Sequence, residues 1–211
     1  VVKKLWQLLP QADFWKTVGF SFVRIVSGFL LGLFAGIILA AAACGCKVLE
    51  ILLAPVVTVM KSVPVASFII LCLIWLPSRN LSVFITFLMV FPAVYTNVCQ
   101  GIRETDRELL EMAQVFLVSF GRKVRYIYIS QAAPYFLAAC RLALGLCWKA
   151  GVAAEVIGIP GGSIGEKLYH AKIYLNTPDL FAWTIVIIGI SVLFEKLFLT
   201  GIGTLVERMG K

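Results

Sequence analysis

Residues 103–131 read RETDRELLEMAQVFLVSFGRKVRYIYISQ, a polar segment between long apolar ones. Acidic side chains come early in this segment and basic side chains come late: Glu104, Asp106, Glu108 and Glu111, then Arg122, Lys123 and Arg125. A much shorter loop would reconnect two membrane spans. The segment therefore favours a surface that docks something in the cytoplasm.

The chain around this segment is too apolar for a soluble domain. Of its 211 residues, 61% are hydrophobic and 14% are charged, with a mean hydropathy of +0.96. Soluble proteins are about one quarter charged. This composition predicts an all-α, polytopic helical membrane protein. The net charge of +8 comes from bases scattered over loops and span ends, so no nucleic acid partner is predicted.

Five apolar regions are long enough to cross a membrane or enter it. Regular spans are predicted at residues 20–43, 81–101, 134–158 and 180–200. The remaining region, residues 48–76, is too long for one regular helix, and Pro55 and Pro64 interrupt it around Lys61. One interpretation is a broken or re-entrant element that leads into a short span at residues 65–76. The other is a surface helix followed by an ordinary span.

The basic residues predict an orientation for these spans. Residues 103–131 are placed in the cytoplasm, together with Lys47, Arg208 and Lys211. The N-terminal segment is then outside. Five spans in this arrangement predict a sixth span upstream of Val1, and the whole of residues 1–211 is expected to form a single transmembrane domain.

A small residue recurs at every fourth position of the first span. The series consists of Gly28, Gly32, Gly36, Ala40 and Cys44. Such a ridge lets two helix backbones approach closely in lipid. We expect it to pack against another helix of the same chain, with a contact between two copies as the alternative.

Within residues 103–131 the pattern predicts two short helices. Thr105 is the expected N-cap of the first, with Glu108 as its capping-box partner. An apolar face at helical spacing follows: Leu109, Leu110, Ala113, Phe116 and Leu117. A break at residues 119–121 precedes a second helix over residues 122–131. An amphipathic hairpin on the membrane surface is the alternative.

Ionisable side chains inside the spans are candidates for a translocation path, because such groups are costly in lipid. Arg141 and Lys149 are eight residues apart and so share one helix face. With Glu155 and Lys61 they form the predicted path, and the cationic face suits an anionic solute. Alternatively, Arg141 and Glu155 extend to opposite membrane boundaries, which leaves only Lys149 deep in the membrane.

The tripeptide Glu111-Met112-Ala113, followed by a turn and by Ile127-Tyr128-Ile129, resembles the EAA loop of ABC importer permeases. The order of other pieces is similar to the sulfonate, taurine and nitrate branch of that family. These pieces are SFVRIVSGF at residues 21–29, Pro64-Val65-Ala66, Phe91-Pro92, Asn97, Gly101, Ala132-Ala133-Pro134-Tyr135, RLALG at residues 141–145, Trp148 and Ala154-Glu155.

Two positions depart from the family's motif. Leu117 occupies the place of a glycine, and Ser130 occupies the place of a proline. Leucine does not easily adopt the positive φ that glycine allows. We therefore expect the turn of the loop to be shifted to Gly121.

The resemblance implies the membrane-spanning permease of a type I ABC importer in the bacterial cytoplasmic membrane. It implies that a separate ATPase subunit binds the loop at residues 103–131, with Glu108, Glu111, Ala113, Gly121 and Arg122 in the coupling site. A second permease copy, an extracytoplasmic substrate-binding protein and membrane lipid are the other implied partners. The chain has no Walker A motif, so ATP hydrolysis is expected on the partner and not on this chain.

Other classes of protein are less consistent with the sequence. An ATP-independent secondary transporter or channel would show internal repeats, and none is clear. A membrane enzyme would need a catalytic cluster, but the chain has one histidine and few acids in its spans. Cys44 and Cys46 are the only close cysteine pair and have no nearby partner ligands, so no metal or cofactor is predicted.

Overall fold

A computed structural model describes the backbone of residues 2–209 and the side chains of residues 4–204. Every regular element in these ranges is helical, which confirms the all-α prediction. The helices are α1 (Val2–Leu8), α2 (Ala12–Gly45), α3 (Lys47–Ser62), α4 (Val65–Trp75), α5 (Ser78–Arg103), α6 (Arg107–Val115), α7 (Phe120–Lys123), the π-helical turn η1 (Val124–Tyr128), α8 (Ile129–Gly158), α9 (Ile164–Ile173) and α10 (Thr177–Met209).

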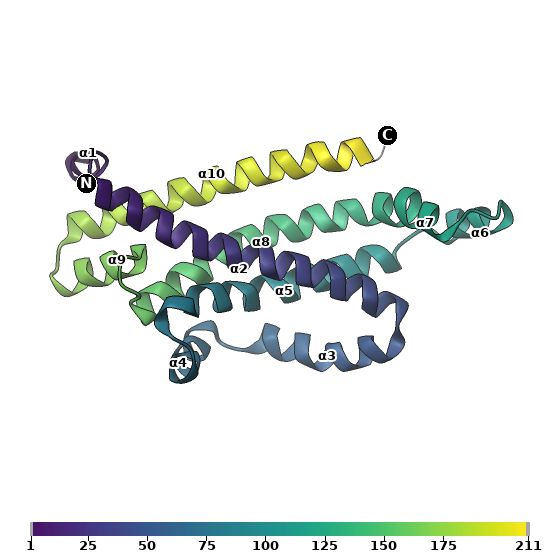
Figure 1. Cartoon of the computed structure of the whole chain (residues 1–211), viewed down its shortest axis with the longest axis horizontal. Helices are drawn as coiled ribbons and strands as arrows, with labels where there is room; N and C mark the ends of the chain where they lie inside the picture. Colours follow the sequence, from purple (N-terminus) through teal and green to yellow (C-terminus); the bar gives the residue numbers. More distant parts are fainter. Residues whose placement is uncertain (1, 210–211) are drawn as a thin grey trace.

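Four long helices run along the long axis of an elongated bundle (Figure 1). The segments long and apolar enough to cross a membrane are Ala12–Gly45, Ser78–Arg103, Phe120–Gly158 and Thr177–Thr204. They contain the four regular spans predicted from the sequence, and all but Phe120–Gly158, which ends where its predicted span ends, extend beyond them at both ends. The prediction of a polytopic membrane protein is therefore confirmed.

The second apolar region forms a broken element. Helices α3 and α4 meet at an angle of 108°, and Figure 1 shows α3 along the bundle while α4 lies across it. The break falls at Val63, whose backbone is extended, because the proline that follows disfavours helical geometry at the preceding residue. Pro55 lies inside α3 without ending it. The 11 residues of α4 reach about 16 Å, so α3 and α4 together form the broken or re-entrant element that the prolines predicted.

The ridge of small residues on α2 packs against α5 of the same chain. A Cβ added to Gly28 would lie 2.4 Å from the carbonyl oxygen of Val83, and one added to Gly36 would lie 2.8 Å from Cβ of Val94. Gly32, between them, is equally crowded. The interpretation of the ridge as an intramolecular contact is confirmed.

Helix α8 completes this core with its own face of small residues. They are buried against α2 and α5 at helical spacing: Ala139, Cys140, Ala143, Cys147, Ala150 and Ala154. The buried cysteines thus act as small apolar side chains, as their apolar surroundings in the sequence indicated. Trp148 packs beside them, with its ring near Phe22 of α2 and Phe194 of α10.

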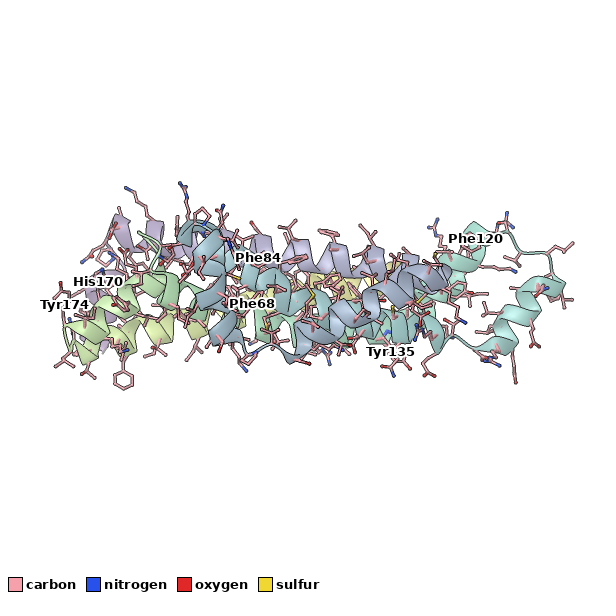
Figure 2. The ribbon with its side chains drawn as sticks, turned by 90° about the horizontal axis from the view of Figure 1, so that it is seen from below. Phe68, Phe84, Phe120, Tyr135, His170 and Tyr174 are labelled. Atoms are coloured by element: carbon pink, nitrogen blue, oxygen red, sulfur yellow. The ribbon has the colours of Figure 1, made fainter. Side chains whose placement is uncertain are left out.

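The two ends of the bundle differ. Figure 2 shows Phe120 at one end and His170 and Tyr174 at the opposite end. We call these the α6 end and the α9 end after the short helices they carry (Figure 1). Lys47 begins α3 at the α6 end, as the predicted orientation requires. Lys211 and the side chain of Arg208, also used for that orientation, lie outside the described residues.

Candidate functional site

The polar segment forms a projection at the α6 end. Helix α6 begins after Asp106, whose carboxylate accepts a hydrogen bond of 2.8 Å from the backbone N–H of Glu108. Thr105 is buried, and its hydroxyl donates instead to the carbonyl of Gly101 in α5. The predicted Thr105 capping box is therefore wrong, because Asp106 is the cap and Thr105 is bound to the preceding helix.

The turn after α6 is centred on Leu117. Its φ of 51° is left-handed, its N–H donates to Gln114, and the N–H of Val118 donates to Ala113 over 2.9 Å. These two bonds form a Schellman motif, which usually has glycine at the left-handed position. The predicted shift of the turn to Gly121 is wrong, since Gly121 lies inside α7. The paired bonds hold leucine in a conformation that costs an L-residue about 1–2 kcal/mol.

The basic half of the segment belongs to a span. Helices α7 and α8 and the turn η1 form one continuous helical segment over Phe120–Gly158. Residues 122–131 are helical, as predicted, but their helix continues into the span and does not end before it. Arg122 and Lys123 lie in α7 at its start, and Arg125 lies in the wider turn η1 that follows.

An exposed apolar tip dominates this projection. It consists of Met112, Val115, Phe116, Leu117 and Phe120, whose side chains are 50–90% exposed. Glu108, Glu111, Gly121 and Arg122 are exposed around it, whereas Ala113 is 1% exposed and packs inward. Sequence reasoning missed this tip because it placed Phe116 and Leu117 on the apolar face of the first helix, together with Leu109, Leu110 and Ala113. The signal was the apolar run at residues 115–118, which is too long for a single face.

Two of the residues predicted to line the translocation path lie on an exposed face of α8. Arg141 and Lys149 are exposed, with Gly145 between them, and their Cα atoms are about 12 Å apart along the helix. Neither forms an ion pair with any acid among the described residues. The face is a positively charged stripe, as the spacing predicted.

Lys61 lies elsewhere, in a polar groove between α3 and α5. The groove has a volume of about 500 Å³ and is lined by polar residues that include Thr58, Lys61, Thr96 and Gln100. Towards the α6 end it is bounded by an ion pair in which Arg103 contacts Glu50 over 2.7 Å.

Glu155 has a different position from the other candidates. It is 0% exposed, and its Oε2 accepts hydrogen bonds from Ser21 Oγ over 2.7 Å and from the N–H of Gly165 over 3.3 Å. Ser21 Oγ in turn accepts from the N–H of Ile164. This carboxylate does not lie with Arg141 and Lys149 on the exposed face of α8. It clamps the start of α9 onto α2 and α8.

Arg24 extends the buried polar cluster towards α5. It is 8% exposed, and its Nε donates to Ser82 Oγ over 3.3 Å. The sequence showed Arg24 near the start of a span without indicating a partner. The sequence signal that could have indicated this contact is that Arg24 and Ser82 are polar residues at matching depths in two spans.

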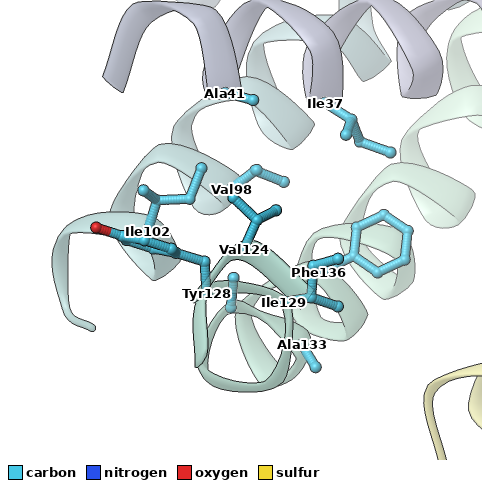
Figure 3. Close-up of a pocket in the computed structure, with 10 residues that line it drawn as sticks. Ile37, Ala41, Val98, Ile102, Val124, Tyr128, Ile129, Ala133 and Phe136 are labelled. Atoms are coloured by element: carbon cyan, nitrogen blue, oxygen red, sulfur yellow. The ribbon is translucent and has the colours of Figure 1, made fainter. Parts of the chain in front are cut away.

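A second cavity, shown in Figure 3, is apolar. It has a volume of about 300 Å³ and lies between α2, α5 and the beginning of α8. Its lining includes Ile37, Val98, Tyr128 and Phe136 and no charged side chain. It offers no favourable contact to an anion.

Comparison with known proteins agrees with this architecture. The sequence profile of the family described as "Binding-protein-dependent transport system inner membrane component" matches residues 19–209. This chain belongs to that family. It is a membrane-spanning permease subunit of an ABC importer, and the alternative of an ATP-independent transporter or channel is not supported.

Similar proteins come from the branch that the sequence resembled. The permease is 28% identical over 187 residues to a putative aliphatic sulfonates transport permease protein, SsuC, of Bacillus subtilis, covering 88% of this chain and 67% of the relative. It is 30% identical over 152 residues to the nitrate import permease protein NrtB of Synechococcus elongatus, covering 72% and 54%.

A solved structure shares the fold. A chain described as "Crystal structure of an amino acid ABC transporter with histidines" superposes with a TM-score of 0.58 at 18% identity, covering 91% of the permease and 90% of that chain. At this identity the likeness concerns the fold alone.

Proposed function

We propose that this permease imports a small anion and is driven by a separate ATPase subunit that binds the α6 end. The observation that carries the proposal is the apolar tip, whose side chains, led by Leu117 at 90% exposure, project from the polar segment. A charged rim around an apolar centre is the usual anatomy of a protein interface. The names of the sulfonate and nitrate permeases among its relatives support an anionic solute.

In this proposal the residues of the coupling loop at 103–131 have different roles. The apolar tip fills a groove of the ATPase, and Glu108, Glu111 and Arg122 contact its rim. Ala113 is 1% exposed and supports the loop from within, because its carbonyl accepts the N–H of Val118 that closes the turn after α6. Gly121 allows the partner to approach α7, since nothing lies within 4 Å of the position of its missing Cβ.

The remaining partners follow from the surfaces that the single chain leaves uncovered. A second permease copy would cover the exposed apolar side chains of α3 and α4, such as Ile51, Val59 and Ile74. Lipid would cover the outer face of α10, and anionic headgroups suit Lys123 and Arg125. An external substrate-binding protein would dock at the α9 end.

The experiment that tests the coupling assignment is Glu111→Lys in the assembled transporter. Reversing this charge on the rim should reduce the co-purifying ATPase at least about tenfold, equivalent to about 1.4 kcal/mol. ATP-dependent uptake should fall in parallel. Glu104→Lys makes the same charge change at the end of α5, before α6 begins, and should leave association unchanged. Equal ATPase recovery from both variants would show that α6 is not the coupling site.

The α8 stripe predicts a second effect, on transport alone. Lys149→Met removes the positive charge from the proposed path and should lower uptake of a sulfonate such as taurine several-fold. ATPase recovery should stay at the wild-type value because Lys149 lies far along α8 from the coupling loop. Lys149→Arg keeps the charge and should retain most of the uptake. Normal uptake by Lys149→Met would remove this residue from the path.

A further inference from the structure

Two adjoining cavities lie at the α9 end, between α2, the first turn of α5 and the loop that precedes α9. Their volumes are about 520 and 350 Å³, and both are lined by Phe20 and Arg79. The first also contacts Ser78 and Pro160, and the second contacts Arg24 and Asn80. We call these six residues the arginine cleft.

The arginine cleft has a fixed positive charge deep within it. Arg24 is 8% exposed, and its guanidinium lies 4.7 Å from the centre of the Phe20 ring while its Nε donates to Ser82. Its Nη2 is buried and has no hydrogen-bond partner among the described residues. A buried donor without a partner is costly, so this nitrogen indicates an incompletely satisfied polar site.

A second positive charge lies at the mouth of the cleft. Arg79 is exposed and forms no ion pair with any acid whose side chain the structure describes. It lies in the first turn of α5, where the unpaired backbone N–H groups favour negative charge. Asn80, next to it, can supply a further amide donor.

Among the side chains that the structure describes, no acid lines either cavity. Glu155 interacts electrostatically with Arg24: its Oε2 is engaged by Ser21 and Gly165, and its Oε1 is buried without a hydrogen-bond partner among the described residues. Three other acids of the α9 end have partners: Asp13 pairs with Lys167, Asp179 pairs with Lys4, and Glu166 accepts a hydrogen bond from the N–H of Gly162. The charge of Arg79 is therefore left for a ligand.

We propose that the arginine cleft binds a small oxyanion at the extracytoplasmic mouth of the permease, before it passes into the bundle. The inference rests on the proposed function, because it places the anion on the side from which it is imported. Guanidinium groups bind oxyanions through paired N–H donors, which a sulfonate or a nitrate accepts equally well. A lipid phosphate offers the same chemistry, and we assign the cleft to the free solute because its deeper charge lies below the surface.

The test uses a Ser78→Cys reporter in vesicles that contain the assembled transporter without ATP. Ser78 lines the cleft, whereas the native Cys44 and Cys46 lie at the opposite end of α2 and the other four cysteines are buried. Impermeant thiosulfonate reagents are added to the α9 side. The quantity measured is the labelling rate with the anionic sulfonatoethyl reagent divided by the rate with the cationic trimethylammonioethyl reagent. This ratio should be about three- to tenfold higher at Ser78→Cys than at a reporter outside the cleft.

Arg79→Gln in the reporter background should abolish this preference, and millimolar methanesulfonate should slow labelling only when Arg79 is present. Lys172→Gln is the matched control, because it removes one exposed charge from the same end. The labelling is repeated in vesicles with and without anionic lipid, which distinguishes binding of the free solute from binding of a lipid phosphate. Methanesulfonate protection in neutral lipid supports the solute site, and protection that depends on anionic lipid overturns it.

An unchanged reagent preference in Arg79→Gln would also overturn the proposal. This outcome is distinct from failure of the proposed function, because the labelling requires neither ATP nor movement of the solute. Loss of ATPase association in Glu111→Lys and loss of anion selectivity in Arg79→Gln are independent results. Arg79 is exposed, so its replacement should leave the yield of folded protein unchanged.

Discussion

Gly28→Val is expected to unfold the permease or to prevent its accumulation in the membrane. Even the first carbon of a side chain at this position would lie 2.4 Å from the carbonyl oxygen of Val83 and 2.8 Å from Cβ of Thr86. The two helix backbones would have to separate along the longest contact of the core. Overpacking of this kind costs about 3 kcal/mol or more, because the obstacle is backbone and not a flexible side chain.

The measurement is the melting temperature of the detergent-purified protein, followed by size-exclusion chromatography. Gly19→Ala is the matched control on the same helix, since its new Cβ would meet nothing within 4 Å. It should be neutral or slightly stabilising, because alanine favours a helix over glycine by about 1 kcal/mol. If Gly28→Val melted like the wild type, the ridge of small residues would be free for another copy and not packed on α5.

Glu155→Leu is expected to have the second largest effect. It leaves Ser21 without its acceptor, frees the N–H of Gly165 and removes the carboxylate that balances Arg24. Breaking a buried charged network on one side costs about 3–5 kcal/mol. The clamp on α9 should also open, so hydrogen exchange at the amides of Ile164 and Gly165 should accelerate at least about tenfold.

Glu155→Gln distinguishes the contribution of the hydrogen bonds of Glu155 to stability from the contribution of its charge. Its amide oxygen can still accept from Ser21, so part of the stability and most of the amide protection should return. Hydrogen exchange distinguishes the clamp from a general loss of stability, because the remainder of α8 should exchange at the wild-type rate in the Gln variant. Unchanged exchange at Ile164 and Gly165 in the Leu variant would contradict the clamp.

The spans of this permease could be predicted from the sequence because each depends on local composition. A run of about 20 apolar residues must be helical in lipid, whatever it packs against, since its backbone has no other hydrogen-bond partner. The spacing of Gly28, Gly32 and Gly36 likewise indicated a close helix contact. The polar segment and its EAA-like motif were recognisable for the same local reason, because their residues are adjacent in the chain.

Other features required contacts between residues far apart in the sequence. Glu155 was predicted to line the translocation path. Its hydrogen bond with Ser21, 134 positions away in the sequence, instead makes it part of a buried clamp. The arginine cleft likewise joins Arg24 and Arg79 from two helices.

Hydropathy and helical periodicity thus determined which segments cross the membrane, because the lipid acts on each segment separately. The tertiary structure alone decided which charges are buried, which face a cavity and where the chain bends. These outcomes depend on the neighbour that each side chain meets, and a buried carboxylate or guanidinium is stable only where another helix supplies its partner.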